Sequence, residues 1–508
     1  MTTVNTTAWN SWAEYRGQEQ QTSALPSGGN LPVALFYPAD YSVGMSNLGY
    51  HYIYRALKES GVWVERFFAG PYPFRSVEKD TLLERFETIM ASISYEGDVP
   101  GFARWLADAG IAPSRTQRGE RMPIVCAGGA ITYINPLSLS DIADVVVLGD
   151  GLPVLPTLIG GLRSGRSRDS TLESLAEHPS IFVPSIHLAG GGARLQRSVD
   201  SSFDYGVGTW VSSKTVFGRT CLVELQRGCA RKCRYCTLPA CFGPFRQRRI
   251  ADLRSDLERV AQTANFDQVG FVTPEASDYA DLDALLEFVE QLGKGVSFAS
   301  LRVDALTKRT VRALVFGGRR SLTIAPETGD DGLRAQTGKR FTNCDVIEKL
   351  QLAKQEGIRN VKLYFMMGLP NEEIEHIEAI ANLCETIKTE TGLLVHAAVS
   401  PFVPKPGTAW AACDFEDLRI LKKKSGVLKK SFRSGTAGSL QIASLREALE
   451  EYTISWASAA TSREIARRAS AGDGSRLTDR EADKAAALDE MVKLGLGDSE
   501  RLASTLRR

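Results

Sequence analysis

Several classes of protein are excluded by what the sequence lacks. Nine cysteines among 508 residues are too few for a disulfide scaffold. No run of about 18 apolar residues occurs, because Asp, Gly, Pro or Arg interrupts every candidate, so no membrane span is predicted. The N-terminus has neither a basic start nor an apolar core, so a secretion signal is not predicted. We therefore expect a cytoplasmic protein.

The chain also lacks an excess of charge of either sign. Its formal net charge is +1, which provides no overall field for attracting nucleic acid or an acidic membrane. The 43% apolar and 24% charged residues are ordinary for a globular protein. A chain of 508 residues is too long for one hydrophobic core, so two or three domains are expected, and we find no internal repeat.

The few cysteines are crowded into one place. The stretch "RGCARKCRYC", residues 227–236, contains Cys229, Cys233 and Cys236, and Cys241 follows closely. Such crowding in a reducing cytosol indicates a metal or redox role. A disulfide would leave one of the three unpaired. A structural zinc needs four ligands; Cys241 could be the fourth, although no second C-x-x-C or H-x-x-x-H follows. The remaining alternative is a 4Fe–4S cluster on three thiolates, with one iron open.

The flanks of this loop support a ligand site. Residues 220–226, "TCLVELQ", alternate in the manner of a strand, so the loop follows the carboxyl end of that strand. In barrel-like α/β folds that end carries the chemistry. Positive side chains surround the loop and are expected to favour thiolate over thiol. They are Arg227, Arg231, Lys232 and Arg234.

The C-x3-C-x2-C spacing resembles the signature of the radical S-adenosylmethionine (SAM) enzymes, with the aromatic Tyr235 before the third cysteine. The wider run "VELQRGCARKCRYCTLPACFGPFRQR" is similar to a subset with an Arg-Gly-Cys opening and an Arg-rich "PFRQR" segment. The resemblance implies that SAM chelates the open iron through its amino and carboxylate groups. An electron then cleaves SAM to a 5′-deoxyadenosyl radical, or SAM serves as a methyl donor. It also implies a flavodoxin- or ferredoxin-type electron donor.

Residues 215–413 alternate between strand and helix patterns. Helical spacing occupies 250–263, a strand follows at 268–273, and "LDALLEFVEQLG" is predicted to be a helix ended by Gly293. This alternation indicates a parallel sheet with crossover helices. We expect a partial TIM-type (β/α)6 barrel, as the family resemblance also implies.

The resemblance assigns SAM-binding roles to polar residues at the strand ends. It places Glu275 at the SAM amino group, Arg302 at the SAM carboxylate, Glu327 at the ribose and Gly368 against the adenine. Tyr235 is expected to pack against the cluster or the adenine. The alternative for each is an ordinary loop residue or helix cap, since turns favour such residues. No catalytic residue is assigned.

Residues 31–160 are expected to form a separate, doubly wound (Rossmann-like) domain with ligand loops at the carboxyl ends of its strands. "CAGGA" and "INPLSLSDIADVVVLGDG" resemble the glycine-containing stretches of the cobalamin-binding module that precedes many radical SAM barrels. The cobalt-ligating D-x-H-x-x-G loop is absent, because Asp40 is followed by Ser42 where the histidine would stand. His51 is interpreted as a packing or surface residue. Two alternatives therefore stay open: cobalamin bound without a protein ligand to cobalt, or a vestigial module.

The other segments are less informative. Residues 1–30 are an N-terminal extension, 161–214 have the Gly-, Ser- and Arg-rich composition of a linker, and 414–508 are expected to be helical. Residues 418–433 hold seven Lys or Arg and no acid. We interpret them as a solvated helix face rather than a tRNA contact, since Phe432 is the only aromatic residue in the stretch.

These observations predict a radical SAM transferase, cobalamin-type, that methylates or otherwise modifies an unactivated carbon of a small metabolite or peptide. One alternative is a methylthiotransferase-like RNA-modifying enzyme; only Cys126 occurs in the first third of the chain, which leaves no additional cluster motif there. Another alternative is a metal-stabilised binding protein without enzymatic activity. Neither the substrate nor the oligomeric state follows from the sequence.

Overall fold

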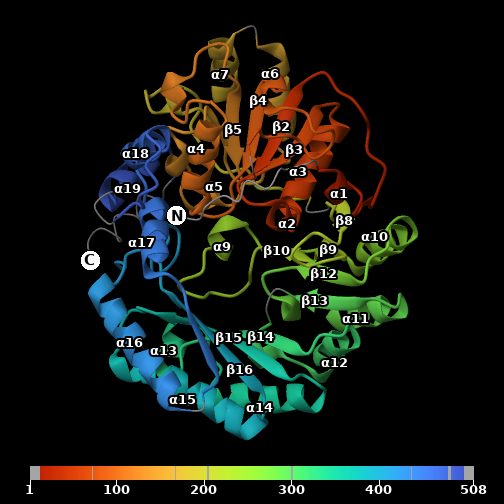
Figure 1. Cartoon of the computed structure of the whole chain (residues 1–508), viewed down its shortest axis with the longest axis vertical. Coiled ribbons are helices and arrows are strands. Elements are labelled where there is room, and N and C mark those ends of the chain that lie inside the picture. Colours follow the sequence, from red (N-terminus) through yellow and green to blue (C-terminus); the bar gives the residue numbers. More distant parts are fainter. Residues whose placement is uncertain are drawn as a thin grey trace.

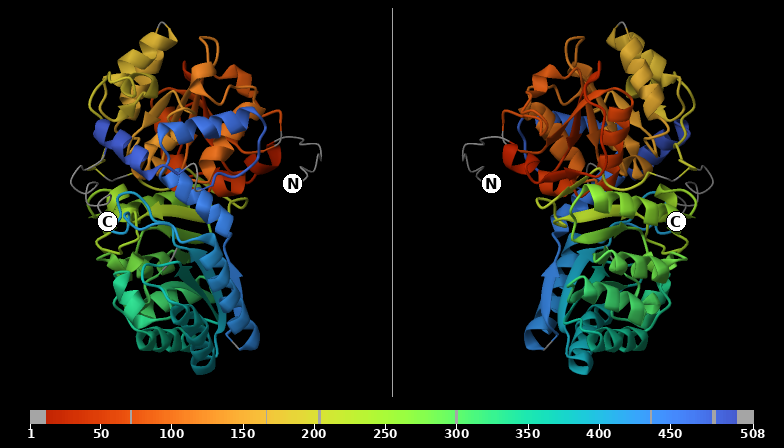
Figure 2. Two further views of the ribbon diagram at one scale, coloured as in Figure 1. Left: turned by 90° about the vertical axis from the view of Figure 1, so that its left-hand side faces the viewer. Right: turned by 90° about the vertical axis from the view of Figure 1, so that its right-hand side faces the viewer.

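The computed structural model describes residues 12–496, except 71, 166, 203–204, 299–300, 436 and 479–481. Two α/β units are stacked on each other, with the last helices beside the first unit (Figure 1 and Figure 2). This arrangement agrees with the expected Rossmann-like domain, barrel and helical region. Within the described ranges, no helix is long and apolar enough to cross a membrane.

The first unit is built on a six-stranded sheet. In spatial order its strands are β3 (Trp63–Phe68), β2 (Pro32–Tyr37), β4 (Thr88–Ser92), β5 (Ile124–Gly128), β6 (Val145–Val147) and β7 (Ile181–Phe182). All neighbours pair in parallel except β6 and β7. When the five parallel strands are numbered by their order in the chain, they lie in the sheet in the order 2-1-3-4-5. This is the flavodoxin-like doubly wound order, and sheets of this kind bind ligands at the carboxyl ends of their strands.

Helices cover both faces of this sheet. They are α2 (Tyr41–Gly44), α3 (Leu48–Glu59), α4 (Asp98–Asp108), α5 (Ile131–Ile134), α6 (Leu155–Ser164), α7 (Arg168–Ala176) and α8 (Pro184–His187). One apolar core joins one face to α4, and a second joins the other face to α3, α6 and α7. Because both faces are covered, the strands are buried along nearly their whole length, as in other parallel sheets.

The stretch 161–214 contains regular structure that its composition did not indicate. It carries the end of α6, all of α7, β7 and α8, and finally β8 (Trp210–Ser212). Strand β8 pairs antiparallel with β1 (Glu19–Gln21), which follows the short helix α1 (Ala13–Arg16). Since β7 extends the first sheet, we propose that the first domain continues through α8.

The second unit is a partial barrel of parallel strands. Its strands form two ladders, β13-β12-β9 and β14-β15-β16-β17. They are β9 (Thr220–Glu224), β12 (Gln268–Val272), β13 (Gly295–Phe298), β14 (Ser321–Glu327), β15 (Asn360–Met367), β16 (Leu394–Pro401) and β17 (Ser439–Ile442). Strand β17 lies in the region expected to be only helical, and it pairs with β16. It therefore adds a strand after the six that were expected.

The helices of the barrel alternate with its strands. They are α10 (Ile250–Thr263), α11 (Leu282–Gln291), α12 (Lys308–Phe316), α13 (Asp331–Gln336), α14 (Asn343–Gln355), α15 (Ile374–Thr391) and α16 (Leu418–Ser434). Helix α11 shows why they form: Leu282, Leu285, Leu286 and Val289 recur at helical spacing and are all buried. The helix predicted there is confirmed.

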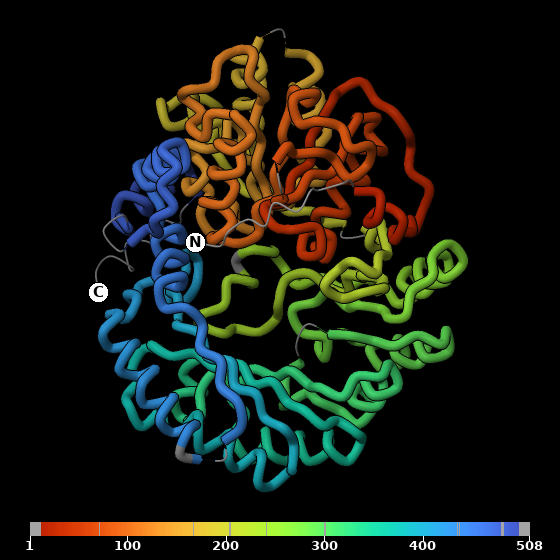
Figure 3. The backbone as a smooth tube through the Cα atoms, in the orientation of Figure 1, coloured from red at the N-terminus to blue at the C-terminus, as the bar shows by residue number. Residues whose placement is uncertain are grey.

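The last helices return to the first unit. Helix α17 (Leu445–Ser455) leaves the barrel, where it contacts β16 and α16, and is followed by α18 (Ala459–Ser470), which packs on α4, and by α19 (Lys484–Lys493) (Figure 3). Their apolar side chains, including Trp456 and Ile465, belong to the same core as Phe36 and Phe102 of the first sheet. Segments from early and late in the sequence therefore share one core.

Candidate active site

The cysteine loop projects from the barrel toward the carboxyl edge of the first sheet. A two-residue ladder closes its base, in which β10 (Gln226–Arg227) pairs antiparallel with β11 (Arg246–Gln247). The short helix α9 (Leu238–Cys241) follows the third cysteine. In Figure 1 this loop occupies the space between the two units. Each sheet therefore presents its ligand-binding edge to the same region.

Cys229, Cys233 and Cys236 lie together on this loop and are half-buried. The amide of Cys236 donates to the carbonyl of Cys233 at 3.2 Å, which tightens the turn between them. Among the described residues, no group of three His, Cys, Asp or Glu side chains converges to hold a metal ion. Cluster thiolates bind different iron atoms and need not converge on one point.

The charge expected around the thiols is partly neutralised. Arg231 pairs through Nε with Asp278 at 3.0 Å, so its guanidinium is directed to a carboxylate rather than to sulfur. Burial raises the pKa of Cys236 to about 11 and also raises the pKa of Cys229. At Cys229 and Cys236, burial therefore outweighs the effect of the flanking cations.

Cys241 is separated from the other three by its packing. It is 4% exposed and lies against Tyr133 and Ile134 of the first unit, with Phe242 beside it. Burial raises its pKa to about 11. A buried, protonated thiol in an apolar contact between the units fits a packing role better than a ligand role.

The turn after α13 is hydrogen-bonded to the cysteine loop and packs closely against it. The amide of Arg234 donates to the carbonyl of Thr337 at 2.9 Å. Gly338 has φ +94°, and a Cβ there would lie 2.9 Å from the carbonyl oxygen of Lys232 and 3.2 Å from Cα of Cys233. Only glycine therefore allows this approach without a shift of the loop.

Replacing Gly338 by Ala is expected to weaken cluster retention. The new Cβ combines a left-handed backbone, which costs about 1–2 kcal/mol, with contact against the chain between two cysteines. Iron content after gel filtration of reconstituted protein measures the effect. Gly318→Ala is the matched control, since Gly318 has φ +80° but nothing within 4 Å of its Cβ. An equal iron content in the two variants would contradict a role of Gly338 in holding the cysteine loop.

Tyr235 joins the cysteine loop to the end of β14. Its hydroxyl donates to Oε1 of Glu327 at 2.6 Å, and Nζ of Lys339 donates to the same oxygen at 2.5 Å. Glu327 is 6% exposed and adopts a left-handed φ of 69°, which is unfavourable for a residue other than glycine. The hydrogen bonds from Tyr235 and Lys339 stabilise this backbone conformation. Burial, with the charge of Glu327, raises the pKa of Tyr235, so the phenol remains a donor at neutral pH.

Glu275 and Arg302 also lie together. Glu275 is 4% exposed, and its two carboxylate oxygens accept the amides of Ser277 at 3.0 Å and of Arg302 at 3.1 Å. The guanidinium of Arg302 pairs with Asp304 at 2.7 Å. Burial raises the pKa of Glu275. The structure thus gathers an acid and a cation at adjacent strand ends of the barrel.

Gly368 ends β15 next to a buried ion network. Its amide donates to Oε2 of Glu372 at 2.6 Å, and Nζ of Lys424 lies 2.9 Å from the same oxygen. Lys424 also pairs with Glu416 at 2.6 Å and is 3% exposed. The basic stretch 418–433 is therefore not solvated throughout, because Lys424 anchors α16 beneath this strand end.

Other residues of this site were not identified from the sequence. Lys339 and Gly338 share the segment "TGK", which follows Glu327 at a distance that could have drawn attention to it. Gln226, whose side-chain amide donates to the carbonyl of Glu275, had no such signal. Met366 packs beside Tyr235 in an apolar cluster with Phe402 and Trp410.

Two cavities meet at the loop. One, of about 940 Å³, lies inside the barrel, with Leu222, Phe271, Phe298 and Leu301 in its walls. The other, of about 410 Å³, lies at the carboxyl edge of the first sheet, with Ser94, Gly128 and Gly149 in its walls. They share five lining residues: Ser46, Glu224, Arg227, Phe242 and Val272. Both volumes are typical of ligand pockets.

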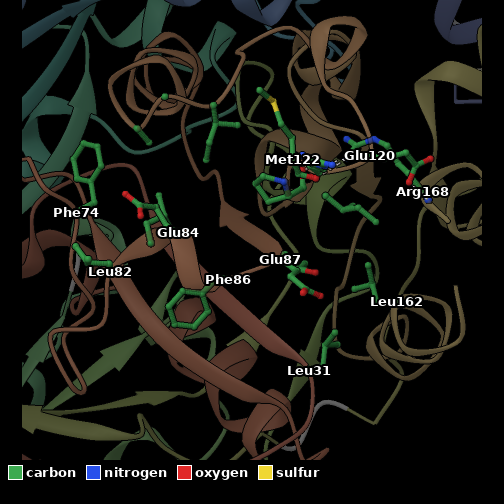
Figure 4. Close-up of a pocket in the computed structure, with 18 of the residues that line it drawn as sticks. Leu31, Phe74, Leu82, Glu84, Phe86, Glu87, Glu120, Met122, Leu162 and Arg168 are labelled. Carbon is green, nitrogen blue, oxygen red and sulfur yellow. Dashed lines mark hydrogen bonds between the residues drawn. The ribbon is translucent and has the colours of Figure 1, made fainter. Parts of the chain in front are cut away.

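A third cavity, of about 690 Å³, lies at the opposite, amino edge of the first sheet (Figure 4). Phe86, Met122 and Leu162 contribute apolar walls, and Glu84 and Glu87 contribute carboxylates. It is separated from the cysteine loop by the length of the sheet, so we assign it no part in the chemistry of the loop.

His51 is fixed within the first unit. Its Nε2 lies 3.1 Å from the carbonyl of Met45, and its Nδ1 accepts the amide of Thr209 at 3.0 Å. The ring is 1% exposed and packs against Trp210. Both nitrogens are engaged, which agrees with the packing role expected for it and leaves neither nitrogen for cobalt.

Acid is expected to destabilise the fold through His51. Burial lowers its pKa from 6.5 to about 3, so between these pH values the unfolded chain takes up a proton that the folded chain does not. Stability therefore falls as pH falls, by roughly 1.4 kcal/mol per pH unit in this window. Urea midpoints at pH 7 and pH 5 measure the loss. The His51→Asn variant should lose less over the same interval; an identical loss would contradict the assignment.

The comparisons with known proteins define the class. Residues 49–184 match the family described as radical SAM proteins, N-terminal, and residues 223–384 match the radical SAM superfamily. The chain therefore belongs to the radical SAM superfamily, whose members use a 4Fe–4S cluster and SAM. It is a radical SAM enzyme.

Its fold is that of two cobalamin-dependent members. The methyltransferase TsrM of Kitasatospora setae, solved with cobalamin and a [4Fe–4S] cluster, has a TM-score of 0.52 at 15% identity, over 75% of this chain and 74% of that one. OxsB, solved with aqua-cobalamin and SAM, has a TM-score of 0.52 at 14% identity, over 82% of this chain and 58% of that one. At these identities the likeness shows the fold alone.

Among sequence relatives, an uncharacterised protein of Methanocaldococcus jannaschii is 28% identical over 403 residues, which is 79% of this chain and 83% of that protein. A tRNA-2-methylthio-N(6)-dimethylallyladenosine synthase of Dehalococcoides mccartyi is 24% identical over 216 residues. That match covers 40% of this chain and half of the synthase.

Proposed function

We propose that this enzyme binds cobalamin in the cavity at the carboxyl edge of β2, β4, β5 and β6. We infer that it methylates, or otherwise modifies by radical chemistry, an unactivated carbon of a small metabolite or peptide. The observation that carries this proposal is the shared wall of the two cavities. A ligand held by the first sheet there faces the region where the barrel holds its own ligands.

The residues present fit the cluster and SAM. We propose Cys229, Cys233 and Cys236 as the cluster ligands and Tyr235 with Glu327 as the contact to the ribose side of SAM. Glu275 and Arg302 would meet its amino and carboxylate groups, and Gly368 its adenine. When bound, these groups supply one-electron cleavage of a carbon–sulfur bond, and the corrin supplies a carrier for a methyl group. The chain orients them and excludes water.

The first unit fits a corrin without a protein ligand to cobalt. Small residues leave its strand ends open, among them Ala91, Ala127 and Gly128, and none of the described residues that line the cavity is a histidine. His51 is engaged on both nitrogens. The two solved relatives of this fold are described with cobalamin. These observations support a functional module over a vestigial one.

The RNA-modifying alternative has less support. Two tRNA-modifying relatives are matched over about half of their own length, and a third over 76% of its length at 21% identity. Cys126, the cysteine available in the first third of this chain, is 2% exposed. We also infer that a flavodoxin- or ferredoxin-type protein supplies the electron. RNA that co-purifies with the protein and dissociates steeply with salt would revive the alternative.

Optical spectroscopy with metal analysis tests the proposal. Protein reconstituted anaerobically with iron, sulfide and cobalamin should carry about four Fe, retain a corrin spectrum after gel filtration, and consume SAM under a strong reductant. Absence of iron, or about one Zn in its place, would sink the radical SAM assignment of the loop. Iron and SAM turnover without a retained corrin would show that the first unit is vestigial.

A further inference from the structure

Three charged side chains lie at the seam between the two units. Asp150 comes from the "GDG" turn after β6, Glu224 ends β9, and Arg227 lies in β10. Arg227 donates from Nε and Nη2 to the two oxygens of Glu224 at 2.9 and 2.8 Å, and from Nη1 to Oδ1 of Asp150 at 3.1 Å. Their side chains are only 8–13% exposed, so this is a buried ion bridge between domains.

Each end of the bridge is fixed from its own side. The hydroxyl of Tyr133 donates to Oδ1 of Asp150 at 2.8 Å, and the amide of Asp200 donates to Oδ2 at 2.7 Å. The guanidinium of Arg227 lies 4.8 Å from the ring centre of Tyr205. The rigid, planar guanidinium binds both carboxylates in fixed directions, so it fixes their relative positions as well as balancing their charge. A Lys ammonium supplies the charge without this fixed geometry.

The bridge touches both cavities and the cysteine loop. Arg227 and Glu224 line both cavities, and Asp150 lines the one on the first sheet. Arg227 is also two residues before Cys229, in the ladder that closes the base of the loop. One guanidinium therefore connects the wall of the proposed corrin site to the base of the proposed cluster site.

Stability alone does not account for this arrangement. Removing charges from water costs several kcal/mol for each ion, and well-packed apolar groups usually stabilise a protein as well or better. Here Arg227 faces two carboxylates, and the charge of the buried Arg248 also acts on Glu224. Fixed geometry is what such a buried bridge provides that an apolar contact does not.

We propose that Arg227 and Asp150 are positioning residues that fix the corrin site relative to the cluster loop. Transfer of the SAM methyl group across the seam then depends on the bridge more than cleavage of SAM within the barrel does. This inference rests on the proposed function, because it requires cobalamin in the first unit.

Two products of SAM report the two processes separately. S-adenosylhomocysteine forms when the methyl group leaves the sulfonium for a two-electron nucleophile, here the reduced corrin, and the sulfur keeps the bonding pair. 5′-Deoxyadenosine and methionine form when one electron from the reductant cleaves the bond between sulfur and C5′, and the 5′-deoxyadenosyl radical takes a hydrogen atom from a C–H donor in the buffer or the protein. Both products can be quantified from one sample without the natural substrate.

The test uses full-length, reconstituted protein with saturating cobalamin, SAM and titanium(III) citrate. In Asp150→Asn and Arg227→Gln, the ratio of S-adenosylhomocysteine to 5′-deoxyadenosine should fall about tenfold or more, as expected for misplacement of reacting groups. Arg227→Lys should recover part of the ratio, because it keeps a cation at the bridge. Arg219→Gln is the matched control. It breaks the exposed ion pair of Arg219 with Asp267, and Arg219 directly precedes β9, the strand that Glu224 ends.

Each other outcome has a definite meaning. An unchanged ratio in both bridge variants would overturn the inference, and so would a parallel fall of both products, which indicates a merely structural role. A wild-type protein that makes 5′-deoxyadenosine but neither retains cobalamin nor makes S-adenosylhomocysteine would overturn the proposed function, and this inference with it. Retained corrin with an unchanged ratio in the variants would overturn the inference alone.

Discussion

Replacement of Cys229, Cys233 or Cys236 by Ala is expected to remove the iron–sulfur cluster and all cleavage of SAM. The three sulfurs lie on one loop, and Arg227 and Phe242 on either side of them line both cavities. A cluster left with two protein thiolates lacks the third ligand that it needs. Iron and sulfide content, the visible spectrum and 5′-deoxyadenosine formation measure the loss. Turnover retained in any one of the three variants would refute the assignment.

Cys241→Ala is the matched control for that experiment. Cys241 is in the same segment but is more protected from solvent, and it packs against Tyr133 and Ile134 rather than within the loop. The variant should keep its iron and its SAM cleavage, at a cost in stability limited to a small cavity. Loss of the cluster in this variant would revive a site of four thiolates.

Gly128→Leu is expected to abolish corrin binding while the iron content stays that of the wild type. Gly128 ends β5 in the wall of the smaller cavity, and only Val147 lies within 4 Å of a Cβ built there. A leucine side chain can therefore enter the cavity without strain and occupy the proposed corrin site. We expect cobalamin affinity to fall about 100-fold or more, or roughly 2.7 kcal/mol, as measured by spectral titration.

Gly101→Leu provides the control, because Gly101 lies in α4 with nothing within 4 Å of a Cβ and does not line this cavity. It should bind cobalamin as the wild type does. If Gly128→Leu also retained wild-type affinity, the corrin would have to bind elsewhere, and the shared wall of the two cavities would lose its proposed meaning.

The parts of this structure that the sequence predicts are those set by local pattern. Alternation of strand and helix over the barrel, and the helix ended by Gly293, follow from the spacing of apolar residues and from the preference for glycine after a helix. The cysteine loop is visible because its ligands lie within eight positions. In each case the information lies within one or two elements.

The contacts that the sequence does not predict join distant segments. Tyr235 meets Glu327 across 92 positions, and Arg231 meets Asp278 across 47. The second contact directs the guanidinium of Arg231 to an acid from another strand end, and burial outweighs the charge of Arg231 and raises the pKa of Cys229. The sequence around the loop does not indicate that Asp278 is the partner of Arg231.

Tertiary packing also overrides composition in the stretch 161–214. Its Gly, Ser and Arg content is typical of a linker, yet Leu172 and Leu175 of α7 are buried on the first sheet. A capping box at Ser167, formed with Ser170, begins that helix. Serine is common in both loops and helix caps, so only the buried leucines separate the two interpretations, and their partners lie far away in the chain.

The shared core of the first sheet and the last helices sets an order for synthesis. Phe36 and Phe102 leave the ribosome early, whereas Trp456 and Ile465, which pack in the same core, are added after the whole barrel. Domains that fold as they emerge usually contain their whole core. Here the first domain stays incomplete, with apolar surface uncovered, until the final helices are released. The barrel is therefore synthesised before the core of the N-terminal domain is complete. Truncation of the C-terminal helices should leave apolar surface of the N-terminal domain exposed and cause it to aggregate.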